Sequence, residues 1–174
     1  LGQVQGWLTD EGSRLRIAAD STRVGGTVHL DRMLAELRAP IPDQGSAPND
    51  PGLELFTTLT IAAAALLSRI DRALLHSDAV EAPNGRVWLL VGNALAGKTT
   101  TTLNLIRAGW RYLSDDHVVL APTDADDDVM VEGWPRVFHP DAGWEEGEIT
   151  GRRIDLDPRR LGADRWVRRT PLAG

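Results

Sequence analysis

The chain has 174 residues, a net charge of −6 and no cysteine. This length fits one domain, or one domain with a smaller lobe. The acidic charge argues against general nucleic-acid binding, and the lack of cysteine excludes disulfides, thiolate metal sites and a cysteine nucleophile. With no basic-then-apolar signal visible either, we expect a cytoplasmic protein. The chain runs from Leu1 to a TPLAG end, and we expect a fragment or a trimmed domain.

The first segment has a pattern that predicts strands. The runs LRIAAD, TVHL and AELRAP are short and partly alternating, and Gly25-Gly26 is a turn signal between two of them. Asp31-Arg32 is typical of a tight turn or of the entry to a short helix. Residues 39–52 are rich in Pro, Gly, Asp, Asn and Ser, which predicts a linker. We therefore expect a β-rich N-terminal segment over residues 1–40 and an α/β domain over residues 41–174.

A long helix is predicted over residues 53–75. Its core, LTIAAAALL, is apolar nearly all round, which indicates burial on most sides. A membrane span is the alternative, but the apolar stretch is shorter than the ~20 residues that a bilayer requires. We therefore expect a buried helix and no membrane partner.

The next segment predicts a β-hairpin. LHSDAVEA has strand character, PNG is a turn signal, and RVWLLV is an apolar run typical of a buried parallel strand. His76 stands at the head of the first strand. A histidine there suits a contact to a phosphate or assistance to proton transfer; the alternative is an ordinary strand-end histidine satisfied by the backbone.

The apolar run leads into GNALAGKT, which fits the phosphate-binding pattern G-x-x-x-x-G-K-[ST]. The glycines allow a tight turn that points backbone N–H groups at phosphate oxygens. Lys98, the only lysine of the chain, adds a cation for the β and γ phosphates, and Thr99 offers a hydroxyl to Mg²⁺. The helix predicted from TTTTLNLIRA adds the positive end of its dipole. The predicted nucleotide-binding residues are Gly92, Asn93, Ala94, Leu95, Ala96, Gly97, Lys98, Thr99 and Thr100.

Two adjacent carboxylates follow this helix, which we expect to end at Gly109. Strand-like runs in WRYLSDDHVVLAP flank Asp115 and Asp116, so strand, helix and second strand predict a βαβ unit with both aspartates near the γ phosphate. Two carboxylates beside a phosphate require a cation, which indicates Mg²⁺, and one of them can take a hydroxyl proton. A polar turn capped by aspartate is the alternative. Farther along, Glu148 is a candidate second metal ligand.

Taken in order, these features resemble the catalytic domain of the HPr kinase/phosphorylase family. The shared features begin with a histidine at the head of a strand and the loop GNALAGKT. A short helix that ends in the segment LIRAGWRYL follows, and then an aspartate pair with VVL shortly after it, in the segment DDHVVL. The resemblance covers residues 70–121 and implies a P-loop α/β domain of the phosphoenolpyruvate carboxykinase-like type. It matches His76 to the active-site histidine and Asp116 to the acid/base aspartate, with Asp115 near the metal. Glu148, in GEITG, resembles a Glu-Ile-x-Gly metal-binding motif of the family.

The resemblance implies a kinase that uses ATP and Mg²⁺ to phosphorylate a serine-type hydroxyl of a protein or peptide. The catalytic residues would be Asp116, Lys98, His76 and Asp115, and the metal ligands would be Thr99, Asp115 and Glu148. HPr kinases are hexameric, so a homo-oligomer is expected. Two alternatives stay open: a nucleotide-binding regulatory module with impaired catalysis, and a kinase that acts on a small-molecule hydroxyl.

Overall fold

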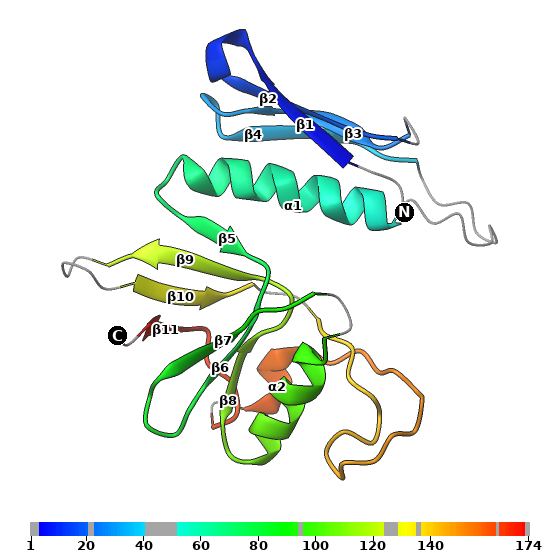
Figure 1. The fold of residues 1–174 in the computed structure, drawn as a ribbon, viewed down its shortest axis with the longest axis vertical. Helices are drawn as coiled ribbons and strands as arrows, with labels where there is room; N and C mark the ends of the chain where they lie inside the picture. Colours follow the sequence, from blue (N-terminus) through cyan, green and yellow to red (C-terminus); the bar gives the residue numbers. More distant parts are fainter. Residues whose placement is uncertain are drawn as a thin grey trace. The chain divides into compact units, whose positions relative to one another are not determined.

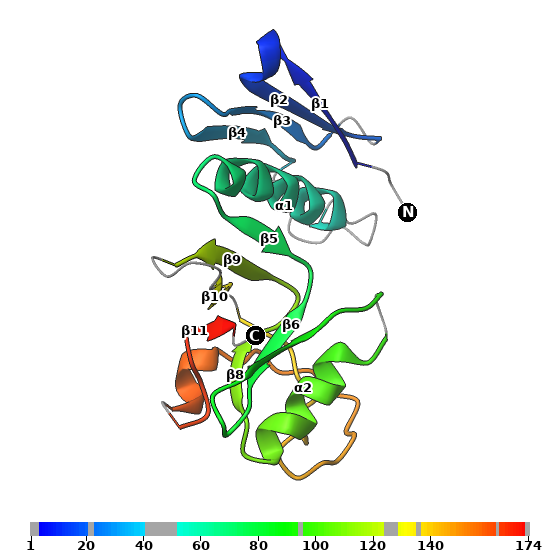
Figure 2. The same ribbon diagram turned by 60° about the vertical axis from the view of Figure 1, so that its left-hand side comes forward.

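The computed structural model of the chain describes residues 4–20, 23–40, 52–93, 96–123, 129–134, 137–162 and 164–172. The chain divides into two compact units, Leu1–Asp71 and Arg72–Gly174. Every paired strand in the described part of the chain is antiparallel to its neighbour, and two α-helices accompany the sheets. The fold is therefore mixed α/β and mostly β, as Figures 1 and 2 show.

The first unit is a four-stranded meander with one helix packed on it. Its strands pair in the order β1-β2-β3-β4, and α1 contacts all four of them. Alternating apolar residues face this helix, and Ile17, Val28 and Ala62 form the buried centre. The elements are β1 (Val4–Thr9), η1 (Asp10–Gly12), β2 (Arg14–Ala19), β3 (Gly25–His29), β4 (Leu34–Arg38) and α1 (Gly52–Ser68).

This unit contains the predicted strands of the β-rich start and differs from the prediction in two details. The Gly25-Gly26 pair lies inside β3 instead of in a turn, whereas Asp31-Arg32 lies in the turn before β4. The predicted boundary at residue 40 precedes the observed one at Asp71, because α1 packs on the N-terminal sheet. The predicted linker lies mostly outside the described residues.

Helix α1 is shorter than predicted. It ends at Ser68, and Ala73–Leu75 forms the strand β5 instead of a last helical turn. Pairing of β5 with β9, far along the sequence, overrides the local helical pattern. The helix also exposes two large side chains, Phe56 and Leu59, so it is not buried on most sides. No helix within the described residues has the length and apolar character to cross a membrane.

The second unit contains two antiparallel sheets and α2. One sheet has the order β11-β10-β9-β5, and the other has the order β7-β6-β8 with α2 packed on β6 and β8. The remaining elements are β6 (Asp78–Glu81), β7 (Val87–Leu90), α2 (Lys98–Arg107), β8 (Arg111–Ser114), β9 (Val118–Pro122), β10 (Val129–Gly133), η2 (Pro158–Leu161) and β11 (Arg169–Leu172).

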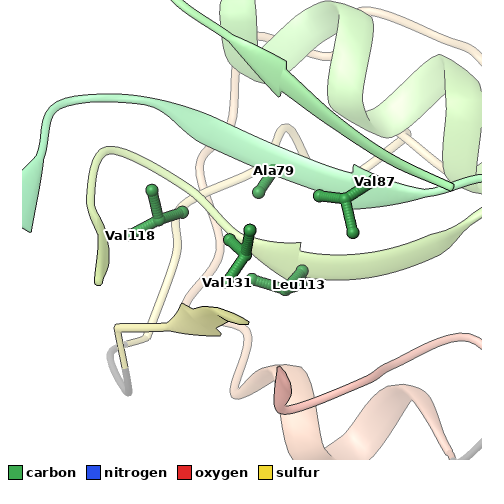
Figure 3. Packing of buried hydrophobic residues seen from close by; sticks show 5 residues of the cluster. All are labelled: Ala79, Val87, Leu113, Val118 and Val131. Atoms are coloured by element: carbon green, nitrogen blue, oxygen red, sulfur yellow. The ribbon is translucent and has the colours of Figure 1, made fainter. Parts of the chain in front are cut away.

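Two apolar clusters hold the second unit together. Figure 3 shows the first one, which joins the two sheets through Ala79, Val87, Leu113, Val118 and Val131. The second lies on the α2 side of β8, and there the Tyr112 and Phe138 rings stack with centroids 4.7 Å apart. Because side chains alternate along β8, Tyr112 and Leu113 enter opposite clusters. This packing fixes the end of β8, where the aspartate pair follows.

The predicted hairpin is present, with corrections. Residues of β6 pair with β7 across the Ala82–Arg86 turn, but LHSDAVEA is divided between β5 and β6, with His76 and Ser77 between them. The β7 strand was predicted as a buried parallel strand, and this is wrong. Within the described residues it pairs only with β6, antiparallel and at the sheet edge, and Trp88 is 55% exposed. Strands β7 and β8 do run parallel to each other, because β6 is antiparallel to both.

Candidate functional site

The phosphate-binding motif connects β7 to α2. Gly97 precedes the helix with φ +86°, a left-handed conformation that glycine adopts without steric cost. The first helical bond runs from the Thr101 amide to the Gly97 carbonyl, so the amides of residues 98–100 lie before the helical ladder. Such an end attracts anions through N–H groups and the helix dipole. The predicted residues Ala94 and Leu95 lie outside the described residues.

Lys98 lies across this loop. Its Nζ donates to the Gly92 carbonyl at 2.9 Å and to the Asn93 carbonyl at 3.4 Å, and it lies 3.4 Å from Nε2 of His76. In this pair the ammonium group can only donate, and the role of the His76 ring is set by its tautomer. The structure thus brings together the predicted lysine and histidine, from β-strand and helix ends 22 residues apart.

The aspartate pair lies in the turn between β8 and β9. The Ser77 amide donates to the Asp116 carbonyl at 3.0 Å, which places this turn beside the residue that follows His76. The His76 and His117 rings also approach, with centroids 5.3 Å apart. Asp116 has φ +63°, a left-handed conformation that a non-glycine residue rarely adopts. His76 and Lys98 therefore meet at one end of the strands of the β7-β6-β8 sheet, and the turn that carries Asp116 is bonded to Ser77 at the same end.

The two aspartates of the pair have different environments. Asp115 is 6% exposed, and its Oδ1 accepts a hydrogen bond of 3.1 Å from the Tyr112 hydroxyl. Burial, together with the nearby Asp115 charge, raises the pKa of Tyr112, so its hydroxyl keeps the proton that it donates. Asp116 is only partly buried. Asp116 is therefore the more accessible carboxylate of the two, whereas Asp115, predicted as a metal ligand, is buried beside Tyr112.

Asp78 lies directly behind this site, and the sequence analysis did not single it out. It is fully buried in β6; its Oδ1 accepts from the Asp116 amide and its Oδ2 from the Thr102 hydroxyl, both at 3.0 Å. Burial raises the pKa of Asp78, and the two hydrogen bonds act in the opposite direction. An aspartate in the short strand DAVE, whose other acidic residue Glu81 pairs with Arg111, was the available signal, since a buried carboxylate requires partners.

The predicted metal ligands do not all lie together. Thr99 is in the first turn of α2, whereas Glu148 is exposed in a loop whose Glu146 carbonyl accepts from Arg107 at the other end of that helix, 3.5 Å away. Ten helical residues span ~15 Å. The structure therefore places Glu148 at the far end of α2 from Thr99.

A Mg²⁺ ion that binds with a nucleotide needs few protein ligands, and the residues of this site are compatible with that requirement. Within the described residues no three His, Asp or Glu side chains form a metal cage, but Mg²⁺ beside a nucleotide uses one or two carboxylates, phosphates and waters. Thr102 lies one turn after Thr99 on the same face of α2. Because Asp78 binds both Thr102 and the Asp116 amide, the backbone of the Asp116 turn is held near the first turns of α2.

Comparisons with known proteins do not name a family. A scan against protein-family models finds no match for this chain, and a search of curated proteins finds none either. Function is therefore inferred from the geometry of the site and from its motifs.

Proposed function

We propose that the chain is an ATP-dependent, Mg²⁺-requiring kinase that phosphorylates a serine-type hydroxyl of a protein or peptide. The observation that carries the proposal is the contact of Lys98 with His76, together with the hydrogen bond from Ser77, the next residue, to the turn that carries Asp116. Hydroxyl phosphorylation needs an anion site with a proton acceptor beside it. The order of these residues resembles HPr kinase/phosphorylase domains, and we propose the same carboxykinase-like fold for the second unit.

The loop and the first turn of α2 would hold the nucleotide. The amides of residues 98–100 point at the phosphates, and Lys98 exchanges its bonds to the Gly92 and Asn93 carbonyls for bonds to phosphate oxygens. His76, beside Lys98, donates a ring N–H to the transferred group. The Thr99 hydroxyl would hold Mg²⁺, which offsets negative charge on the phosphates.

Asp116 would act on the acceptor. As the hydroxyl oxygen bonds to the γ phosphorus, the bond from this phosphorus to the β–γ bridging oxygen breaks and ADP departs. The hydroxyl proton passes to the Asp116 carboxylate. Asp115, bonded to buried Tyr112, supports the turn from the interior.

The test is transfer from labelled ATP, with Mg²⁺, to serine peptides and to matched peptides with alanine at the acceptor position. We expect label only on the serine peptides, and its loss in Lys98→Ala and Asp116→Asn. Transfer that survives both substitutions would refute the mechanism. ATP binding without transfer would favour the regulatory module, and transfer to small alcohols alone would favour the small-molecule kinase.

A further inference from the structure

The buried carboxylate of Asp78 lies behind the proposed site and not within it. Asp78 is 0% exposed, so no substrate atom reaches its carboxylate. A carboxylate is costly to bury, and an apolar side chain would fill a position in β6 without that cost. Both oxygens of Asp78 are used, each by a different element of the site.

The two hydrogen bonds of Asp78 connect the two halves of the proposed chemistry. Oδ1 accepts from the Asp116 amide and so supports the left-handed conformation of the turn that carries the acid/base carboxylate. Oδ2 accepts from Thr102, one helical turn after Lys98 and Thr99. The backbone of the turn and the phosphate-binding helix are thus fixed to one rigid strand position.

We propose that Asp78 is a positioning residue that sets the separation between the Asp116 turn and the phosphate-binding helix. This inference rests on the proposed kinase function. Displacing a reacting group by ~1 Å costs about a hundredfold in rate. Loosening either bond of Asp78 therefore lowers the rate of transfer, while ATP binding, which depends on the loop itself, is retained.

The chain offers matched variants for each bond. Asp78→Ala removes both bonds, whereas Asp78→Asn keeps an oxygen for the Asp116 amide and presents an N–H to the Thr102 oxygen. Thr102→Val removes the helix bond without changing the shape of the side chain, and Thr102→Ser restores it. We expect kcat to fall about tenfold to a hundredfold in Asp78→Ala and Thr102→Val. KM for ATP should stay within about twofold, and the Asn and Ser variants should recover most of kcat.

A second measurement separates this inference from the kinase proposal. Hydrogen exchange of the Asp116 amide, followed by NMR, needs no acceptor substrate. We expect fast exchange in Asp78→Ala and slow exchange in the wild type and in Asp78→Asn. If the wild type transfers no phosphate, the kinase function fails, and the amide still reports whether Asp78 holds the turn.

The inference is overturned if exchange is the same in all variants, or if Thr102→Val keeps the wild-type kcat. It is also overturned if ATP affinity and kcat fall together, since that pattern indicates a general loss of structure. Should Asp78→Ala fail to fold, the Asp78→Asn, Thr102→Val and Thr102→Ser variants still decide the question.

Discussion

Replacing Asp78 should show how much its two hydrogen bonds contribute to the free energy of unfolding. Asp78→Ala leaves the Thr102 hydroxyl and the Asp116 amide without their acceptor. Each polar group left unpaired in the interior costs about 1–3 kcal/mol, so for the two groups we expect a loss of about 2–6 kcal/mol in the free energy of unfolding. Asp78→Asn preserves both contacts, and we expect a change of no more than about 1 kcal/mol.

Urea unfolding followed by tryptophan fluorescence measures this difference. Of the six tryptophans only Trp7 precedes Arg72, so the signal reports mainly the second unit. A Trp7→Phe background isolates that unit completely. The midpoint should fall in Asp78→Ala with an unchanged m value, because the surface exposed on unfolding stays the same. An Asp78→Asn loss as large as that of Asp78→Ala would refute the reasoning.

We expect the stability difference between the wild type and Asp78→Asn to depend on pH. Burial, the largest effect, raises the pKa of Asp78 above the ordinary value of 3.8. The folded chain therefore binds this proton more tightly than the unfolded chain, and the contribution of Asp78 to stability falls as pH rises from 3.8 through the raised pKa. Asn does not titrate, so the stability of Asp78→Asn relative to the wild type should increase over this window and then stay constant. A decrease over the window would contradict the assignment.

Two further predictions concern structure outside the site. The Gly143 amide, followed by the Thr150 hydroxyl and amide, lowers the pKa of Asp141 to about 2. The amide chemical shifts of this loop should be constant above pH 3.8 and should change as the pH falls towards about 2. In Asp141→Ala they should differ from the wild-type shifts at every pH. A Cβ at Gly133 would overlap the carbonyl oxygen of Leu113, so Gly133→Ala should destabilise the second unit by about 1–3 kcal/mol in urea unfolding. An unchanged urea midpoint for Gly133→Ala would contradict this prediction, because it would show that β10 and β8 accommodate the added methyl group without loss of stability.

Local signals predicted the elements whose residues interact nearby in sequence. The loop GNALAGKT, the helix after it and the PNG hairpin follow from glycine, capping and turn chemistry. Ala73–Leu75 was misassigned because its apolar residues continue the helical pattern, and only pairing with β9 makes it a strand. The run RVWLLV resembles a buried strand, but the order of strands that leaves Trp88 at an edge is a long-range property.

In the site, too, some residues could be predicted from local sequence and others only from long-range packing. His76, Lys98 and Asp116 carry chemistry that residue type and a motif can indicate; the structure brings Lys98 to His76 and bonds the Asp116 turn to Ser77. Asp78 escaped notice because strand alternation does not show that α2 covers it. Its partner Thr102 is one of several threonines in KTTTT, and only helical phase distinguishes it. Long-range packing, in both cases, supplies what the local pattern lacks.

The most direct test of the site is to measure ATP affinity and single-turnover transfer to a serine peptide in the same Asp116→Asn sample. A general base contributes about 10²–10⁴-fold to a rate, so transfer should fall by that factor while the Kd for ATP stays within about twofold of the wild type. A wild-type transfer rate in Asp116→Asn, or a loss of ATP binding that accounts for the whole effect, would contradict a phosphoryl-transfer site built from His76, Lys98 and Asp116.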